Sequence, residues 1–250
     1  MIDRVAVLGV PLSVVKLDSA TAAIVAMAKS GTAGFVTCPD VSNVVRAQKD
    51  EALMRAHLSA AMVSRDGTPL VWVGRLRGYP IGRACGPDLL TNVASLSAHE
   101  GIRHYLYGGK VGVSSKLNAA LTQRSPGIQI VGEETPPFRE LTALELDEVA
   151  ARVNATRAQI LWVGLSTPKQ EALMMKLKGK VTATMIGVGA AFDFISGELP
   201  RAPKWMQRSG LEWLYRLLRE PRRLWRRYLL MAPQFVFLVA KEALIGRRSG

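Results

Sequence analysis

The sequence predicts an α/β protein with a Rossmann-like, mainly parallel sheet, helices on both faces and a basic, amphipathic helical appendage at its C-terminus. Short runs of consecutive apolar residues alternate with helix-length segments along most of the chain. Uninterrupted apolar strands of this kind are typical of parallel sheets that are buried on both faces. Near residue 200 the composition changes to Arg, Trp and Leu. We therefore expect a catalytic domain over residues 1–200 and an appendage over residues 201–250.

Each element follows from this alternation. The expected strands are residues 33–37, 60–64, 103–108, 128–132, 159–164 and 183–189. The expected helices lie near residues 18–30, 41–58, 87–99, 112–124, 142–155 and 168–178. Thr142 and Glu145 have the spacing of a capping box at the start of one of them. Because ligands of such sheets bind beyond the carboxyl ends of the strands, the residues after each strand are the first candidates for a site.

Positive charge is concentrated in the expected appendage. The formal net charge is +13, and residues 201–250 contain 12 of the 33 Lys and Arg but only 3 of the 20 Asp and Glu. This asymmetry indicates an anionic partner, which could be nucleic acid, an anionic membrane surface or a phosphorylated ligand.

The segment "RLLREPRRLWRRY" (216–228) has the pattern of an amphipathic basic helix with a bend at Pro221. Arg216, Arg219, Arg223 and Arg226 follow an i, i+3, i+7, i+10 spacing. The neighbouring tryptophans suit the headgroup region of a bilayer, so we expect an interfacial membrane element. Some of these arginines could instead point inward and bind a pyrophosphate.

Other features limit the class of protein. Cys38 and Cys85 are too few for a disulfide framework, and the first residues lack the pattern of a signal peptide, so a cytoplasmic protein is expected. The longest apolar window, Leu229 to Ala240, contains Pro233 and Gln234 and is shorter than the ~20 residues of a spanning helix. We therefore expect no membrane span.

Asp66, which follows the second strand in "SRDGTPLVW", is the leading candidate for a general base. The alternative is a simple Asp-Gly turn. Thr37 ends the first strand, and Asp40 and Asn43 enter the next helix, whose amides could bind a hydroxyl or phosphate, although helix capping alone explains Asp40. Arg83 precedes another helix and could bind an anion or lie on the surface.

Small-residue turns follow three later strands. Gly108 and Gly109, and then Gly164, introduce turns suited to phosphate or nucleotide contact, and Gln170 could bind a sugar or base. "GVGAAFDFISG" (187–197) contains Asp193 but lacks the third glycine of the dinucleotide fingerprint, so a nicotinamide site is only weakly supported. The sequence has neither an Asp-x-Asp triplet nor a GxxxxGK[ST] loop, so phosphate charge must be neutralised by Arg, Lys and helix dipoles.

Together these motifs resemble the WecG/TagA/CpsF glycosyltransferase family of bacterial surface-polysaccharide and teichoic-acid synthesis. The resemblance covers nearly the whole chain and depends on "RDGTPLVW", "RACGPDLL", "GLSTPKQE", "GVGAAFDFISGELPRAP" and "GLEWLYRLLREPRRLWRRYL". It implies a Rossmann-like enzyme that transfers a sugar, with inversion and without metal or cofactor, from a UDP-sugar to a polyprenyl-pyrophosphate-linked saccharide. It also implies cytoplasmic action at the inner face of the membrane. The apolar surfaces of the body could support self-association.

The resemblance assigns roles to particular residues. Asp66 is expected to be the base, with Thr37 as a second catalytic residue. The expected substrate-binding residues are Asp40, Asn43, Arg83, Gly108, Gly109, Gly164, Gln170, Asp193 and Arg201. Those expected to bind UDP or the membrane are Arg216, Arg219, Arg223, Arg226 and Arg227.

One position departs from the family. Many members carry Asn two residues after the threonine, where this chain has Pro39. Members use N-acetylmannosamine, its uronic acid or glucose, and the missing Asn leads us to expect a hexose such as glucose. Two other classes of function stay open at this point: a nucleic-acid-binding protein that uses the basic tail, although it has no recognised DNA- or RNA-binding motif, and a nicotinamide-dependent oxidoreductase.

Overall fold

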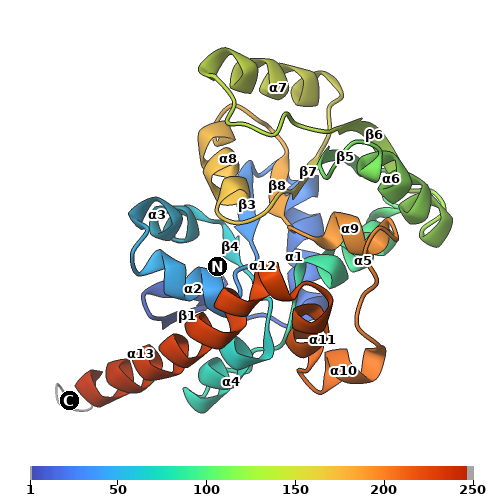
Figure 1. The fold of residues 1–250 in the computed structure, drawn as a ribbon. Helices are drawn as coiled ribbons and strands as arrows, with labels where there is room; N and C mark the ends of the chain where they lie inside the picture. Colours follow the sequence, from blue (N-terminus) through green and yellow to red (C-terminus); the bar gives the residue numbers. More distant parts are fainter. Residues whose placement is uncertain (1, 247–250) are drawn as a thin grey trace.

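The computed structural model describes residues 2–246, and the side chains of Arg208 and Arg223 lie outside that description. Its centre is a six-stranded sheet in the order β4-β3-β8-β7-β5-β6, in which every pair of neighbours is parallel (Figure 1). The strands are β3 (Gly34–Thr37), β4 (Met62–Val63), β5 (Arg103–Gly108), β6 (Gln129–Glu134), β7 (Ile160–Gly164) and β8 (Thr184–Gly187). The predicted α/β, Rossmann-like class is confirmed.

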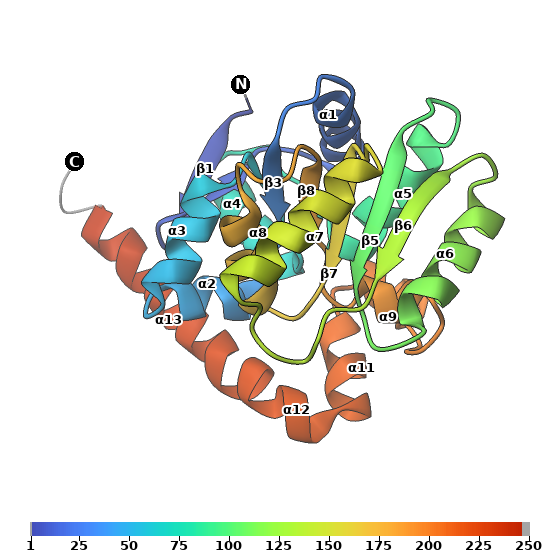
Figure 2. The same cartoon turned by 90° about the horizontal axis from the view of Figure 1, so that it is seen from above.

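Helices cover both faces of the sheet because consecutive strand residues point to opposite sides. Phe35 belongs to one apolar core and Val36 to the other, and Leu161 and Trp162 divide in the same way. One face carries α2 (Val41–Ala47), α3 (Glu51–Ser59), α7 (Ala143–Ala155) and α8 (Lys169–Leu177). The other carries α1 (Leu17–Lys29), α5 (Gly86–Ser97), α6 (Val113–Arg124) and α9 (Ala191–Ile195). Figure 2 shows α7 and α8 on one side of the strands and α1 on the other.

The structure differs from the expected elements at the N-terminal end. An antiparallel hairpin, β1 (Arg4–Val7) and β2 (Val10–Ser13), turns at Leu8 and Gly9, whose φ angles are 50° and 76°. Positive φ at both turn residues is the geometry of a tight hairpin turn. The expected helix over residues 41–58 is two helices, because Asp50 accepts a hydrogen bond from the Leu53 amide and caps a new helix, α3. Helix α4 (Thr68–Leu76) was not predicted.

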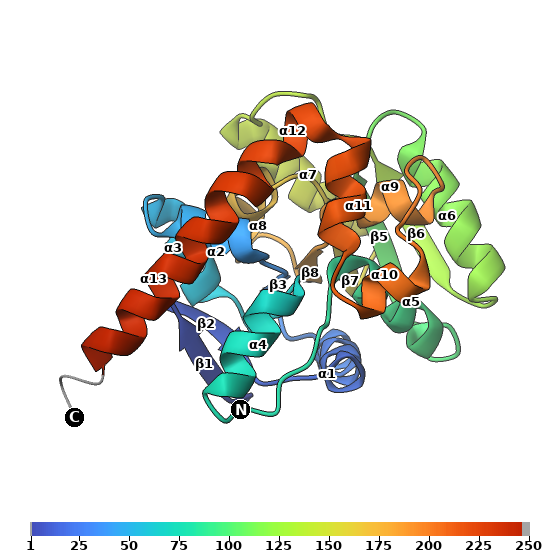
Figure 3. The ribbon, with the colours of Figure 1, turned by 60° about the horizontal axis from the view of Figure 1, so that its bottom comes forward.

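The C-terminal segment is a chain of helices rather than one bent amphipathic helix. It consists of α10 (Lys204–Arg208), α11 (Glu212–Arg219), α12 (Pro221–Trp225), a π-helical turn η1 (Arg226–Leu230) and α13 (Met231–Gly246). Glu220 has φ −132° and ψ 57°, outside the helical region, because the following proline disfavours a helical conformation there. Figure 3 shows α11, α12 and α13 arching across this side of the molecule, with α4 beside them.

The expectation that Pro233 and Gln234 interrupt the last apolar segment is wrong. The helix is continuous from Arg226 to Ile245, and over these 20 residues it is long and apolar enough to cross a membrane, with a mean hydropathy of 1.5. The π-helical turn lies just before Pro233 and changes the backbone where the proline ring would meet a carbonyl. Length and composition alone do not establish a membrane span.

Helix α13 is attached to the body at both ends. Phe235 is only 3% exposed and packs in the same core as the α2 side chains. Near the other end, Glu242 accepts hydrogen bonds from Arg77 (2.5 Å) and from the Leu8 amide (3.2 Å). These contacts fix the path of the chain past the carboxyl ends of β3 and β4. The division of the chain at residue 200 stays a prediction.

Candidate active site

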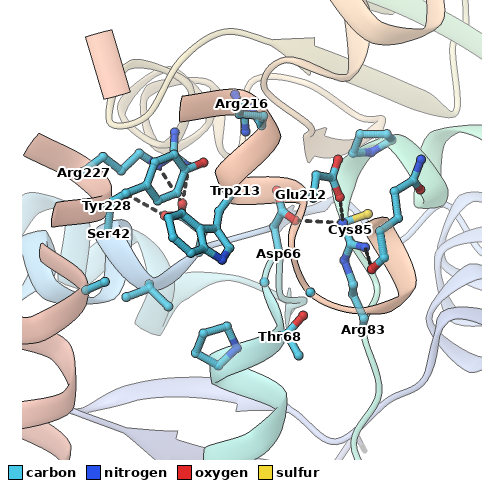
Figure 4. Close-up of a pocket in the computed structure, with 18 of the residues that line it drawn as sticks. Ser42, Asp66, Thr68, Arg83, Cys85, Glu212, Trp213, Arg216, Arg227 and Tyr228 are labelled. Carbon is cyan, nitrogen blue, oxygen red and sulfur yellow. Dashed lines mark hydrogen bonds and ion pairs between the residues drawn. The ribbon is translucent and has the colours of Figure 1, made fainter. Parts of the chain in front are cut away.

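A cavity of about 180 Å³ lies beyond the carboxyl ends of β3 and β4, and we call it the Asp66 cavity. Its walls come from the loops after these two strands, from the start of α5 and from the C-terminal helices. Asp66 lies between Arg83 and Glu212 on one side and Trp213, Arg227 and Tyr228 on the other (Figure 4). The structure therefore brings together predicted residues that are far apart in the sequence.

The segment that carries Asp66 is held by buried hydrogen bonds. The Asp66 amide donates to the Pro39 carbonyl (2.8 Å), and the Ser64 hydroxyl donates to the Ala84 carbonyl (2.5 Å). Between them, the buried Arg65 guanidinium donates to three carbonyls, those of Ser13, Val15 and Gly82. Three carbonyls satisfy a charge that would otherwise be costly to bury. Arg65 thus fixes the backbone from which the Asp66 carboxylate projects.

Burial raises the pKa of Asp66 above its usual value. Arg83 opposes this effect, but its Nη2 lies 3.8 Å from the Asp66 carboxylate, too far for a hydrogen bond. The negative charges of Glu212 and Asp40 raise the pKa further, and Arg216 lowers it. A carboxylate with a raised pKa is a stronger base than an ordinary one.

Asp40 has a structural role, as a helix cap and as the partner of an arginine. It caps α2 by accepting from the Asn43 amide (3.0 Å), as the capping prediction required, and it accepts from the Ser42 hydroxyl (2.7 Å). Its other oxygen accepts from Nε of Arg227 (2.8 Å). Burial alone would raise the pKa of Asp40, but the Arg227 guanidinium, together with the hydrogen bonds from Ser42 and Asn43, outweighs burial and lowers it. Asp40 therefore connects the loop after β3 to the C-terminal helices.

A second cavity of about 250 Å³, the Asp193 cavity, lies beyond β5, β6 and β7. It is lined by Gly109, Gly164 and Asp193 among the predicted residues, and also by Lys110, Lys169 and Lys176. The Gly109 amide donates to the Gly164 carbonyl (3.0 Å), and a Cβ on Gly108 would lie 2.5 Å from that oxygen. Only glycine at position 108 allows the two strand ends to approach so closely.

Arg216 lies beside α9, which contributes a residue to each cavity. Its guanidinium is 5.4 Å from the ring centroid of Phe194, which lines the Asp66 cavity, while the neighbouring Asp193 lines the other cavity. Arg216 itself lines the Asp66 cavity. A cation at this position can reach an anionic group that extends from one cavity into the other.

Five of the predicted catalytic and substrate-binding residues line neither cavity: Gly108, described above, and Thr37, Asn43, Gln170 and Arg201. Thr37 is fully buried and shares a hydrogen bond with Nδ1 of His57 (3.1 Å). The side-chain amide of Asn43 donates to the Thr167 hydroxyl (3.2 Å). The Gln170 side chain accepts from the Gly189 amide and donates to Glu171. Arg201 pairs with Asp88 (2.6 Å) and Glu212 (3.4 Å). These four side chains are therefore bonded within the fold, where they hold the segments that form the cavity walls.

The predicted arginines of the C-terminal segment have different surroundings. Arg216 and Arg227 line the Asp66 cavity. Arg219 and Arg226 are exposed and lie over the rings of Tyr215 and Trp225. The side chain of Arg223 is outside the described residues. The regular spacing of these arginines does not place them on one face, because the helix breaks at Glu220.

Sequence reasoning missed three polar residues near the site. Glu212 lines the Asp66 cavity, Arg65 supports it, and Glu171 is fully buried with one carboxylate oxygen that has no hydrogen-bond partner. Glu212 could have been noticed as a rare acid in a basic segment, and Glu171 as the neighbour of Gln170 in "TPKQE". Arg65 gives no such signal. Within residues 2–246, no group of three or more His, Cys, Asp or Glu side chains is arranged to hold a metal ion.

A parallel α/β sheet with a basic, carboxylate-containing cavity at its carboxyl edge has the ligand-binding arrangement of α/β enzymes. The family model described as "Glycosyl transferase WecG/TagA/CpsF family" matches residues 5–249, so the chain belongs to this glycosyltransferase family. This membership decides against the nucleic-acid-binding and nicotinamide-dependent alternatives.

A particular relative is similar over much of the chain. It is the N-acetylglucosaminyldiphosphoundecaprenol N-acetyl-beta-D-mannosaminyltransferase of Bacillus spizizenii. The two sequences are 33% identical over 186 residues, which is 74% of this chain and 70% of the relative.

Proposed function

We propose that the protein transfers a sugar from a UDP-sugar to a polyprenyl-diphosphate-linked saccharide, with inversion and without a metal ion. The observation that carries this proposal is the position of Asp66, whose pKa is raised by burial, in a cavity that Arg216 and Arg227 also line. A base and cations for a departing diphosphate are the groups that such a displacement needs.

The reaction is a single displacement at the anomeric carbon. The acceptor hydroxyl forms the new C–O bond as its proton passes to Asp66. The bond between the anomeric carbon and the diphosphate oxygen breaks, and its electron pair leaves with UDP. Because attack and departure occur on opposite faces of the sugar, the configuration inverts. Arg216 stabilises the negative charge that develops on the diphosphate.

The two cavities suggest where each substrate binds. The lysines and the Gly109 and Gly164 turns of the Asp193 cavity suit the nucleoside diphosphate. The diphosphate then extends toward Arg216, and the sugar meets the acceptor hydroxyl in the Asp66 cavity. This arrangement places the anomeric carbon between the base and the cation.

The name of the Bacillus spizizenii relative favours an N-acetylmannosamine donor and an acceptor whose lipid diphosphate carries N-acetylglucosamine. Pro39 favours glucose instead, as argued from the sequence. We propose the N-acetylmannosamine donor because the relative's similarity extends over 186 residues, whereas the glucose argument depends on one position.

We further propose that the C-terminal helices dock on the anionic inner face of the cytoplasmic membrane, where the lipid-linked acceptor resides. Exposed apolar side chains are available on every helix from α10 to α13, and they include Trp205, Leu218, Trp225 and Phe237. Exposed Arg219, Arg222 and Arg226 lie among them. Tryptophan beside basic residues is the composition expected of an interfacial element.

A donor screen tests the proposed function. UDP-N-acetylmannosamine, UDP-glucose and UDP-N-acetylglucosamine are each incubated with a short-chain lipid-diphosphate N-acetylglucosamine in the presence of EDTA, and products are identified by mass spectrometry. We expect one added N-acetylmannosamine and unchanged turnover with EDTA. Transfer of glucose alone would reassign the donor, and loss of turnover with EDTA would contradict a metal-independent reaction.

A further inference from the structure

Glu212, the first residue of α11, lies against the arginine nearest to the general base. Its carboxylate accepts a hydrogen bond from Nη2 of Arg83, and the same nitrogen lies 3.8 Å from the Asp66 carboxylate. One guanidinium group therefore lies between two carboxylates, in contact with Glu212 and apart from Asp66 (Figure 4). The Glu212 side chain is only 15% exposed, so water screens this contact weakly.

The contacts around Glu212 fix it in this position. Nε of Arg201 lies 3.4 Å from its other oxygen, and Arg201 is itself held by Asp88 at 2.6 Å. Arg83 is held in turn by the Gln207 carbonyl (3.2 Å). Without the Glu212 charge, the nearest remaining carboxylate to Arg83 is Asp66.

A direct ion pair between Arg83 and Asp66 would weaken the base. An opposite charge in contact with a carboxylate lowers its pKa by about 1–3 units. The other titratable or charged groups that act on Asp66 are Asp40, Arg216, Arg227, Tyr228, Cys38 and Cys85. Of these, Arg227 is already paired with Asp40. Arg83 lowers the pKa of Asp66 more than Arg216 does, so a change in the position of Arg83 affects the base most.

We propose that Glu212 is a positioning residue that holds Arg83 away from Asp66 and so keeps the Asp66 carboxylate free to accept the acceptor proton. This inference rests on the proposed role of Asp66 as the base. Because Glu212 belongs to the C-terminal segment, packing of that segment against the body both completes the cavity and moves Arg83 away from Asp66. In a protein whose C-terminal helices are displaced, Arg83 forms an ion pair with Asp66 and so blocks the base.

The test is the pH dependence of kcat/KM for Glu212→Gln, which has nearly the same shape but no charge. Two effects, loss of a nearby negative charge and movement of Arg83 onto Asp66, both lower the pKa of Asp66. We expect the acidic limb of the profile to shift down by about one pH unit and kcat to fall roughly tenfold. The midpoint of thermal unfolding with UDP should still rise above that without UDP.

Matched variants separate this effect from a general loss of charge. Glu220→Gln removes a carboxylate from the same segment at a residue that lines neither cavity, and its profile should match the wild type. Glu212→Asp keeps the charge and should restore most of the acidic limb. In an Arg83→Gln background, Glu212→Gln should shift the limb much less, because Arg83 is no longer there to move onto Asp66.

An acidic limb within about 0.2 units of the wild type, or a shift to higher pH, would overturn the role of Glu212. An equal shift with and without Arg83 would also overturn it. Asp66→Asn distinguishes this failure from failure of the proposed function: if Asp66→Asn abolishes transfer while Glu212→Gln leaves the profile unchanged, only the inference about Glu212 is wrong.

Discussion

Asp40 and Asp66 show how strongly the distance to an arginine determines what a carboxylate can do. Asp40 is in hydrogen-bond contact with Arg227, and its pKa is lowered although burial acts in the opposite direction. Asp66 is equally part of the cavity wall, but Arg83 stays 3.8 Å away, and burial raises the pKa of Asp66 above its usual value. One carboxylate is therefore structural, and the other is available for proton transfer.

Asp66→Asn is expected to abolish sugar transfer while leaving UDP binding intact. The amide has nearly the shape of the carboxylate but cannot accept the proton of the acceptor hydroxyl, and general-base catalysis typically contributes ~10²–10⁴-fold. Turnover and the UDP dissociation constant are measured on the same preparation. Retained turnover would remove Asp66 from the role of base.

Glu171→Gln is expected to stabilise the protein increasingly as pH rises. Burial raises the pKa of Glu171 above its unfolded value of 4.5. The wild type therefore has this group's full contribution to stability below that value and loses it as pH rises toward the folded pKa. Glutamine does not titrate, so the difference in unfolding temperature between the variant and the wild type should widen as the pH is raised above 4.5. A constant difference would contradict the buried, raised-pKa assignment.

Sequence alone identified residues that follow strands and, through the family resemblance, the cavity arginines Arg216 and Arg227, but it did not identify Glu212. Asp66 was predicted because it follows a strand at the carboxyl edge of a parallel sheet, and Arg83 because it precedes a helix and matches the family's motif. Glu212 was not, since its contact with Arg83 joins residues that are 129 positions apart. Gln170 was predicted to contact substrate, but only the structure shows that both ends of its amide are bonded within the fold.

At the scale of elements, the alternation of apolar runs predicted all six strands of the sheet. The missed elements lack that signal. The first hairpin turns at Leu-Gly, which does not have the Asn-Gly or Asp-Gly sequence typical of such turns. Helix α4 begins right after Gly67, whose φ is 122°, and sequence reasoning assigned this region only to a turn.

Phe235→Ala is expected to loosen α13 from α2. Phe235 is 3% exposed, and truncating a buried Phe to Ala typically costs about 3–5 kcal/mol of stability. The cost falls on a terminal helix, so limited proteolysis should cut there before the sheet unfolds. Phe237→Ala is the matched control, because Phe237 is 67% exposed and its loss should not change the cleavage rate. Equal cleavage of both variants would contradict the packing described here.

At the scale of the whole molecule, the charge is divided between a nearly balanced body and a strongly basic C-terminal segment. Binding to liposomes that contain phosphatidylglycerol should therefore weaken steeply as salt is raised, while binding to neutral liposomes should be weak throughout. Arg222→Glu combined with Arg226→Glu should reduce binding to the anionic liposomes, measured by co-sedimentation. Binding that is insensitive to both salt and these charges would contradict electrostatic docking.

The contact between Asp40 and Arg227 spans 187 positions of the sequence. A ribosome makes the Asp40 loop before the Arg227 turn, so the cavity wall to which both residues contribute cannot form until Arg227 has been made. A chain interrupted between the two positions would therefore lack a complete Asp66 cavity.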